Sequence, residues 1–461
     1  MGSFQDILLL PSFGATKTFF KRQQFVDLLD ASLDDSGNVP PALRKGIWDV
    51  WHGNVWRQLK DNRGCQFFSD EFSIGLTLNV DWFCPFSRSP YKVGVMFMSV
   101  LNLPRKQRMK QRWTMLVGII PGPSEPKLHI NDFLRPLVDD LELLWNGIEV
   151  VLADGSIKAV KAALVCVSCD LPASRKVLQF LGHKSDLGCS KCKFQAERAP
   201  GTHGASGKMS YLTNGETSLS IPLRSGAEVR QQALTYRDAS TKAQQDHLAK
   251  TNGVRYSELL RLPYFDPVEM TAVDPMHCFF LGLVSHEISL ILGTSNDSFS
   301  MLSANQVILK QRIKALNQQL PLDIGRLPGK VVDSDHRAKM TAAQWKHFIV
   351  IYARACFIKL VLLTVYTSLR LLAEVVELLI DDSPTQEIID LIEVRIQRHH
   401  EAYCKAYGKW NVPVNYQMAL HTADCMNDFG PANNFWLFAC ERENAVVGNA
   451  PTNGISIEGQ I

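Results

Sequence analysis

The chain has 461 residues, which exceeds one ordinary domain and provides enough length for a large hydrophobic core. With 46% hydrophobic residues, 21% charged residues and a net charge of +3, the composition excludes a mainly disordered, collagen-like or coiled-coil chain and a uniformly basic nucleic-acid coat. Charged residues interrupt even the most apolar stretch, 347–380, so we expect a soluble protein without membrane association.

Residues 1–70 have a mixed pattern with a helix-like segment at 44–59, and we expect them to form an accessory cap. Three apolar runs rich in β-branched residues follow at 74–83, 93–101 and 113–120. Segments with Pro, Ser and basic residues separate the runs, as turns separate neighbouring strands. The sequence therefore predicts three neighbouring strands, most simply antiparallel.

The next segments continue this alternation of strand and helix patterns. Residues 131–145 carry leucines at helical spacing, which predicts an amphipathic helix. The strand-like runs 148–152 and 160–168 flank Asp154-Gly155, a favoured two-residue hairpin turn. We expect loop with short elements over 193–256, mainly helices over 275–407, and a last helix from 433 to about 447.

Three acidic residues stand where they could converge on one site. Asp81 and Asp170 each end an apolar strand pattern, and Glu441 follows Phe435 and Phe438 at spacings of three, which suggests a shared helix face. Hard carboxylate oxygens are the ligands that hold two Mg²⁺ ions around a scissile phosphate. An acid at a strand end is also a common turn residue, so the pattern alone leaves both interpretations open.

The 11 cysteines, in a chain with no readable export signal, favour reduced thiols and make cysteine pairs candidate metal ligands. Cys189 and Cys192 have the spacing of a zinc knuckle, and Gly188 permits its turn. His183, His277 and His421 are candidates for the remaining ligands, although for His277 or His421 alone a hydrogen-bonded, partly buried imidazole is the better explanation. The pair Cys166 and Cys169 lies in a predicted strand, where packing is the better explanation.

A basic cluster lies between two of the predicted strands. It contains five cations, Arg105, Lys106, Arg108, Lys110 and Arg112. Such a cluster can contact DNA phosphates without reading sequence, or it can be a solvated turn, and the sequence leaves both readings open.

Taken in chain order, several motifs resemble the CACTA (En/Spm) superfamily of DNA transposases, especially the fungal members. The resemblance extends over about residues 40–455. Its carriers are Leu78-Asn79-Val80-Asp81-Trp82-Phe83, Asn102-Leu103-Pro104-Arg105, Ile120-Pro121-Gly122-Pro123, Cys169-Asp170-Leu171-Pro172, Cys189 with Cys192, Asp274-Pro275-Met276-His277, and Asp428-Phe429-Gly430-Pro431 before Glu441-Arg442.

The resemblance implies an α/β protein with an RNase H-like catalytic fold that a large, mainly helical insertion interrupts. It implies an accessory cap at 1–70, the first part of the core with the cysteine knuckle at 71–192, the insertion at 193–410 and the rest of the core with the glutamate helix at 411–461.

The implied activity is DDE-type cleavage and strand transfer at transposon ends. Asp81, Asp170 and Glu441 would hold Mg²⁺ or Mn²⁺, with Asp274 as the alternative third acid. Cys189, Cys192, His277 and His421 would hold structural Zn²⁺, although Gln417 replaces a histidine that relatives carry.

The implied partners are double-stranded DNA at transposon ends and targets, in the nucleus, and further copies of the chain. The family usually continues beyond the glutamate helix, so a truncated or inactive enzyme stays open, as does a non-catalytic DNA-binding or assembly protein derived from a transposase.

Overall fold

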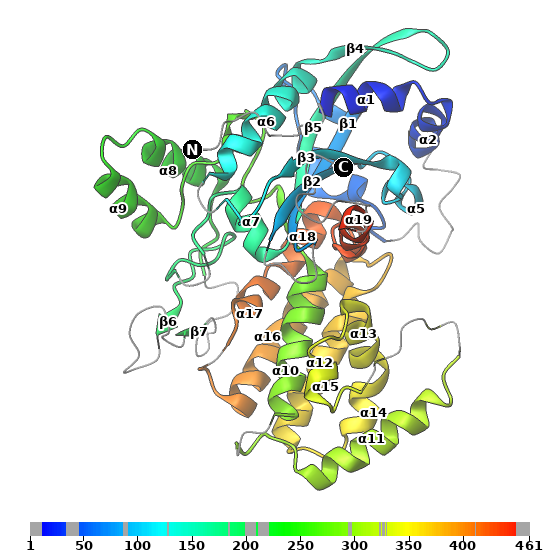
Figure 1. The fold of residues 1–461 in the computed structure, drawn as a ribbon, viewed down its shortest axis with the longest axis vertical. Coiled ribbons are helices and arrows are strands. Elements are labelled where there is room, and N and C mark those ends of the chain that lie inside the picture. Colours follow the sequence, from blue (N-terminus) through cyan, green and yellow to red (C-terminus); the bar gives the residue numbers. More distant parts are fainter. Residues whose placement is uncertain are drawn as a thin grey trace.

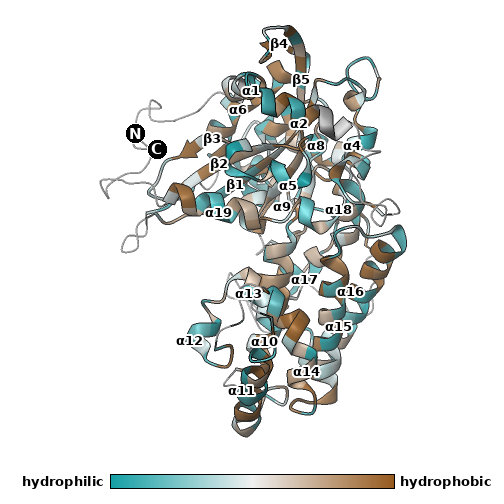
Figure 2. Cartoon of the chain, turned by 90° about the vertical axis from the view of Figure 1, so that its right-hand side faces the viewer, coloured by the Kyte–Doolittle hydropathy of each residue, from teal (hydrophilic) through white to brown (hydrophobic). Residues whose placement is uncertain are grey.

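The computed structural model describes residues 12–33, 46–85, 91–126, 129–182, 185–198, 209–210, 221–293, 297–321, 324, 328, 330–410 and 412–448. The chain forms a sheet-containing part and an elongated helical part, which lie at the top and bottom of Figures 1 and 2. This confirms an α/β protein with a large, mainly helical insertion.

One mixed sheet forms the centre of the first part. Its strands are β1 (Ser73–Phe83), β2 (Val93–Val100), β3 (Thr114–Ile120), β4 (Ile148–Val151), β5 (Ile157–Cys169) and β8 (Thr271–Val273). The order is β3-β2-β1-β5-β4, and β8 also pairs with β5. The antiparallel β1-β2-β3 unit and the β4–β5 hairpin confirm the predicted strands.

The parallel pairings are what bring distant segments of the chain together. β5 runs parallel to β1, and β8 runs parallel to β5. Asn79 reinforces the first pairing, because its side-chain amide donates to the Ser168 carbonyl at 2.8 Å. β8 belongs to residues 193–410, so the segment expected to be an insertion contributes a strand to the central sheet.

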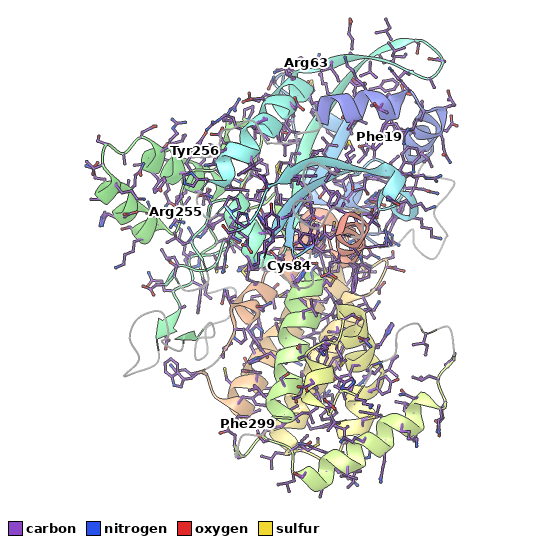
Figure 3. The ribbon with its side chains drawn as sticks, in the orientation of Figure 1. Phe19, Arg63, Cys84, Arg255, Tyr256 and Phe299 are labelled. Atoms are coloured by element: carbon purple, nitrogen blue, oxygen red, sulfur yellow. The ribbon has the colours of Figure 1, made fainter. Side chains whose placement is uncertain are left out.

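Helices cover the sheet on both sides, and the amphipathic helix predicted at 131–145 is confirmed as α6 (Ile130–Asn146). The N-terminal helices α1 (Ser12–Phe20) and α2 (Gln23–Leu33) join the same core. Phe19 of α1 lies 5.7 Å from the Trp113 ring in an edge-on contact (Figure 3). The cap is therefore packed into the sheet-containing part.

Two sequence predictions about helices are wrong. Over 44–59 the described residues form only the short turns η2 (Val50–His52) and α4 (Asn54–Gln58), whereas residues 44 and 45 lie outside the described chain. The polar region 193–256 contains two full helices, α8 (Gly226–Arg237) and α9 (Lys242–Asn252). Their few buried side chains give almost no hydrophobic periodicity, which explains why the pattern reads as loop.

Helices dominate the second part, as predicted for 275–407. They are η8 (Met276–Val284), α10 (Ser285–Ile291), α11 (Ser303–Asn317), α12 (Ser334–Arg337), α13 (Ala342–His347), η10 (Phe348–Ala353), α14 (Arg354–Phe357), α15 (Leu363–Leu379) and α16 (Gln386–Tyr407). α15 and α16 pack along each other. Within the described residues, no helix combines the length and apolar character needed to cross a membrane.

The chain then returns to the sheet through four short elements. These are α17 (Val414–Ala419), α18 (Thr422–Phe429), η11 (Ala432–Asn434) and α19 (Phe438–Gly448). The remaining short elements are η3 (Phe67–Ser69), α5 (Arg105–Arg108), η4 (Gln111–Trp113), α7 (Leu171–Val177), β6 (Glu197–Arg198), β7 (Met209–Ser210) and η7 (Glu258–Arg261). α19 begins five residues later than the sequence predicts and packs against β1.

Candidate active site and metal centre

Three acidic residues mark the carboxyl ends of the three mutually parallel strands. Asp81 lies near the end of β1, Asp170 directly follows β5, and Asp274 directly follows β8. Cys169 pairs with Val273, so Asp170 and Asp274 occupy adjacent positions at one edge of the sheet. The fold therefore gathers strand-end acids that lie far apart in sequence.

Asp81 is held by its own backbone neighbour and by the last helix. The Trp82 amide donates to Oδ1 at 2.7 Å, and the Asn444 side-chain amide of α19 donates to Oδ2 at 2.6 Å. Burial and the nearby Asp170 carboxylate raise the pKa of Asp81 to about 6. The sequence pattern does not identify Asn444 as a partner of Asp81. The one indication of such a role is its position about one helical turn after Glu441.

Asp170 combines a structural role with its place among the acids. It is the N-cap of α7, where its Oδ1 accepts a hydrogen bond from the Ala173 amide at 2.7 Å. Burial raises the pKa of Asp170, and this hydrogen bond opposes the shift. The turn-residue explanation thus accounts for one of its carboxylate oxygens.

Asp274 is the most heavily hydrogen-bonded of the acids and is buried. Its Oδ1 accepts from the amides of Met276 at 3.1 Å and Leu437 at 3.0 Å. Its Oδ2 accepts from the His277 amide at 2.9 Å and lies 2.6 Å from His277 Nδ1. This carboxylate therefore joins the end of β8 to η8 and to the residue before α19.

Glu441 reaches the acids through the same histidine. His277 Nε2 lies 3.4 Å from Glu441 Oε1. Burial lowers the pKa of His277, but the hydrogen bonds to Asp274 and Glu441 outweigh it and raise the value to about 10. A cationic imidazole therefore stands between acids from a strand end and from α19.

The prediction that Phe435, Phe438 and Glu441 share one face of a helix is wrong. Phe435 lies before α19 begins at Phe438, so the helical period does not connect it with Glu441. The Glu441 side chain is 45% exposed, whereas Glu443 and Asn444 are the buried polar residues of this helix. Exposure leaves the Glu441 carboxylate accessible from solvent.

Cys189, Cys192 and His421 form the one group in the described chain whose potential ligand atoms all lie within 4.8 Å of one another. All three side chains are buried, and Cys189 Sγ lies 3.4 Å from His421 Nε2. Burial acts to raise the pKa of Cys189, yet the hydrogen bond with Cys192 and the charge of His421 lower it well below its usual value. Two sulfurs and an imidazole are a donor set suited to Zn²⁺.

Of the other two histidines proposed for this centre, one does not join it. His277 is turned toward Asp274 and Glu441, whereas His183 lies outside the described residues. The positions nearest the centre are instead filled by Gln417, whose side-chain amide donates to Cys192 Sγ at 3.2 Å, and Met418, whose Sδ lies 3.8 Å from Cys189 Sγ. The His421 Nδ1 lies 3.4 Å from Asp424, as an outer carboxylate orients a metal-binding imidazole.

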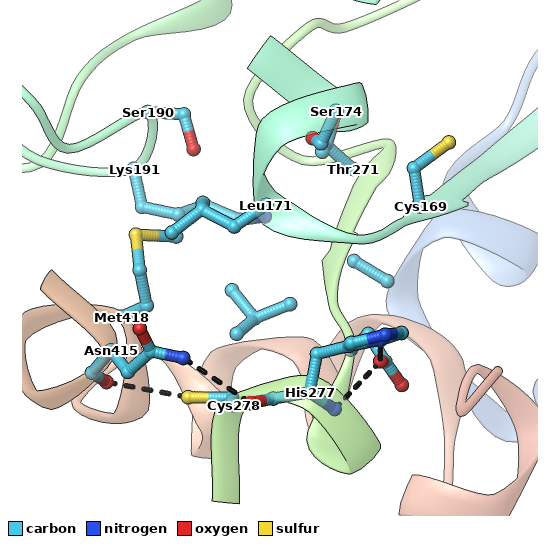
Figure 4. A pocket seen from close by; sticks show the side chains of 13 residues that line it. Cys169, Leu171, Ser174, Ser190, Lys191, Thr271, His277, Cys278, Asn415 and Met418 are labelled. Atoms are coloured by element: carbon cyan, nitrogen blue, oxygen red, sulfur yellow. Dashed lines mark hydrogen bonds and ion pairs between the residues drawn. The ribbon is translucent and has the colours of Figure 1, made fainter. Parts of the chain in front are cut away.

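A small cavity separates the cysteine centre from the acids (Figure 4). Ser190 and Lys191 of the knuckle line one side, and His277, Cys278 and Asn415 line the other. The Asn415 side-chain amide donates to the His277 carbonyl at 3.2 Å. The two centres are therefore close neighbours, connected through α17.

Structural contacts occupy two members of the basic cluster. Arg108 is buried and pairs with Asp49 at 2.6 Å, and Arg105 donates to the carbonyls of Trp48 and Asp382 and to Asn433 Oδ1. Lys106, Lys110 and Arg112 are exposed. Arg108 cannot reach a DNA phosphate without breaking a buried ion pair, so the cluster offers fewer cations to DNA than the sequence suggests.

Part of the chain matches a known protein family. Residues 49–224 match the family model described as transposase family tnp2. The match includes Asp81, Asp170 and the cysteine pair, and it ends at Arg224, whose guanidinium donates to the carbonyls of Cys189 and Cys192. No curated protein matches the chain. Residues 49–224 thus resemble the tnp2 transposase family, which supports a transposase role for this protein.

Proposed function

We propose that this chain is the catalytic core of a DDE-type transposase of the CACTA superfamily, fungal type. Its reaction would be phosphodiester cleavage at transposon ends and transfer of the freed 3′-hydroxyl to target DNA in the nucleus. The observation that carries the proposal is the position of Asp81 and Asp170 at adjacent, parallel strand ends, where each carboxylate is partly buried and has an elevated pKa. The strand order β3-β2-β1-β5-β8 supports an RNase H-like assignment for the sheet.

The donor chemistry of the acids fits Mg²⁺ or Mn²⁺. Besides burial, Asp170 raises the pKa of Asp81, and Asp274 and Glu441 raise the pKa of Asp170, so this group of carboxylates favours a compensating cation. Carboxylate oxygen is the ligand that Mg²⁺ and Mn²⁺ prefer. When bound, the ions would supply the positive charge that activates a water molecule and stabilises the leaving oxygen. The α7 cap orients Asp170, and Asn444 orients Asp81.

Glu441 is the better candidate for the third acid. Both carboxylate oxygens of Asp274 already accept hydrogen bonds from backbone amides. Glu441 is partly exposed and has one contact within this cluster, to His277. We therefore assign Asp274 a positioning role: it orients His277, which holds Glu441 beside the strand-end acids.

The proposal is tested by nicking of duplexes that carry candidate terminal repeats, with Mg²⁺ or Mn²⁺ and with EDTA. Asp81→Asn and Asp170→Asn should abolish metal-dependent nicking while leaving DNA binding in place. Asp154→Asn, in the exposed hairpin turn, is the matched control and should nick like the parent chain. Unchanged nicking in Asp81→Asn would exclude the proposed site.

A non-catalytic DNA-binding or assembly protein derived from a transposase is the second candidate. The observation that favours it is that, among the described residues, the oxygens of Asp81, Asp170 and Glu441 do not form a group of three within 4.8 Å. Salt-dependent DNA binding without nicking in either metal would favour this candidate over the enzyme.

We further propose that Cys189, Cys192 and His421 hold a structural Zn²⁺. Their buried, convergent donors support this assignment. Chelation of the purified protein should lower its thermal midpoint, and Cys189→Ser should remove both the bound zinc and the response to chelator. Cys166→Ser, a buried cysteine on β5, is the matched control and should keep the zinc.

A further inference from the structure

A groove of about 610 Å³ lies on the helical part, between α11 and the segment that leads into α12. Three lysines line it: Lys310 and Lys314, one turn apart on α11, and Lys330 on the opposite wall. All three are exposed, so their ammonium groups can meet a ligand from solvent.

The groove lining carries a net positive charge, because three lysines stand against one carboxylate, that of Asp333. Among the described residues, no ion pair joins any of the three lysines to a carboxylate. The acidic residue in the lining, Asp333, is the N-cap of α12, and its Oδ1 accepts from the amides of Asp335 and His336. Its carboxylate is thus engaged by the helix terminus, while the lysines stay free to bind an anion.

Hydrogen bonds and buried side chains hold both walls of the groove in position. Arg337 donates to the carbonyls of Val331 at 3.0 Å and Val332 at 3.4 Å, which fixes the segment carrying Lys330. On the α11 side, Ile313 is buried and Asn317 accepts a hydrogen bond from the Tyr352 hydroxyl. Spacing between the two lysine-bearing walls is therefore set by the fold.

We propose that this lysine groove binds the phosphate backbone of the DNA duplex on which the acids act, an inference that rests on the proposed function. Lysines are compact point charges on flexible stems, suited to phosphate contacts that do not read sequence. The basic cluster at 105–112 loses Arg105 and Arg108 to structural contacts, so the lysines of the helical part would add to the reduced phosphate-binding charge of the sheet-containing part.

The helix that carries Glu441 and the elements that border the groove lie along one side of the molecule. In Figure 2, α19, α13, α12 and α11 follow one another from the sheet-containing part down the left side of the helical part. Lys339, just after α12, is exposed as well. A duplex contacting α19 can therefore continue along the helical part to the groove.

The test measures binding of the full chain to a labelled duplex by fluorescence anisotropy in EDTA across a salt series, so cleavage plays no part. Replacing Lys310, Lys314 and Lys330 by alanine should weaken binding and reduce the slope of log K against log salt by up to about 2.7, since each lost phosphate contact contributes about 0.9. Replacing the same residues by arginine should preserve the slope, and circular dichroism checks folding.

The matched control removes the same charge from three exposed lysines on other elements, Lys60, Lys158 and Lys250. An alanine triple variant that keeps the parent slope, or a control triple that loses as much slope, overturns the groove assignment while leaving the nicking test untouched. A parent chain that binds no duplex at all overturns the proposed function and the groove together.

Discussion

Asp81, at this edge of the sheet, accepts a hydrogen bond from a side-chain amide on a helix that is distant in sequence. Asn444 comes from the opposite end of the chain, is buried on α19, and donates to Asp81 at 2.6 Å. An outer hydrogen bond of this kind fixes the carboxylate orientation that a metal-binding site requires.

Replacing Asn444 by alanine should reduce metal-dependent nicking about 10–100-fold, the usual cost of losing an outer-shell partner, because the Asp81 carboxylate is no longer held. Raising the metal concentration should restore part of the rate, whereas DNA affinity in EDTA should not change. Asn146→Ala, at an exposed amide on α6, serves as the control. A variant that nicks normally at limiting metal would show that Asn444 has no role in orienting Asp81.

A second buried acid, Asp428, gives a pH dependence of stability outside both centres. Burial raises the pKa of Asp428 to about 6 from its ordinary 3.8. The folded state therefore retains a proton that the unfolded state releases. The stabilisation is complete below about pH 4 and is lost as the pH rises through about 6.

Asp428→Asn should abolish this loss, so the variant gains stability relative to the parent chain between pH 4 and 7, by about 1–3 kcal/mol. Urea unfolding at both pH values measures the difference. Asp61→Asn is a control from the other direction, because hydrogen bonds from Arg63 and Cys65 lower the pKa of the Asp61 carboxyl against the effect of burial. An equal stability difference between Asp428→Asn and parent at pH 4 and pH 7 would contradict the expectation.

At the scale of elements, α17 connects three regions although it has only six residues. Asn415 holds the His277 carbonyl, Tyr416 is buried among the aromatic rings of α16, and Gln417 and Met418 face the cysteines. α17 therefore forms a direct structural connection between the cysteines and the residue that contacts the acids, His277.

Gln417→His should strengthen zinc binding at least tenfold, because the side chain at position 417 already contacts Cys192 Sγ at 3.2 Å and would supply the second imidazole of a closed tetrahedral site. Competition with a chromogenic chelator measures the affinity, and Co²⁺ absorption reports tetrahedral geometry. Asn415→His, on the same helix but directed at His277, should not strengthen binding. Equal zinc affinity in parent and Gln417→His would place the fourth ligand elsewhere.

The elements that the sequence predicts well are those with strong local patterns. Alternating apolar runs identify β1, β2 and β3, and the Asp154-Gly155 turn identifies the β4–β5 hairpin. β8 has three residues, too few for any periodicity, and only its pairing with β5 makes it a strand. α9 begins with a Thr241–Gln244 capping box, a signal that polar composition obscured.

The candidate site was predictable in its residue types and less so in its partners. The sequence places Asp81 and Asp170 at strand ends, and the structure shows that these two strands are parallel neighbours and therefore end at the same edge of the sheet. Their role as metal ligands stays a prediction. The contacts of His277 and Asn444 depend on how η8 and α19 return to the sheet, which no local pattern records. The resemblance to the CACTA superfamily implied a zinc-binding role for His277 beside the cysteines, whereas the fold places His277 among the acids.

At the scale of the whole molecule, two arginines join segments that are distant in sequence. Arg105 donates to carbonyls of Trp48 and Asp382 and to Asn433, which brings together the N-terminal segment, the loop after α15 and the turn before α19. Arg108 binds Asp49 beneath it. The contacts of Arg105 therefore join the helical part to the sheet-containing part.

Arg105→Ala should lower the free energy of unfolding by about 1–3 kcal/mol, since three acceptors lose a charged donor. Urea titration gives the change, and limited proteolysis should cut faster around 46–48 or 381–384. Its neighbour Lys106 is exposed, so Lys106→Ala should leave stability unchanged and affect only DNA binding. The interpretation fails if the two variants are equally stable.

The hydrogen bond from the Leu437 amide to Asp274 has a topological consequence. The chain leaves the sheet at Asp274, directly after β8, and returns at Leu437, whose amide lies 3.0 Å from the Asp274 carboxylate. Residues 275–436 therefore form an excursion from the sheet whose two ends are held together by this hydrogen bond. An excursion anchored in this way can change in length or content without shifting the strands beneath it. The helical part is therefore a site where this architecture can be rebuilt, by evolution or by design, while Asp81 and Asp170 keep their places.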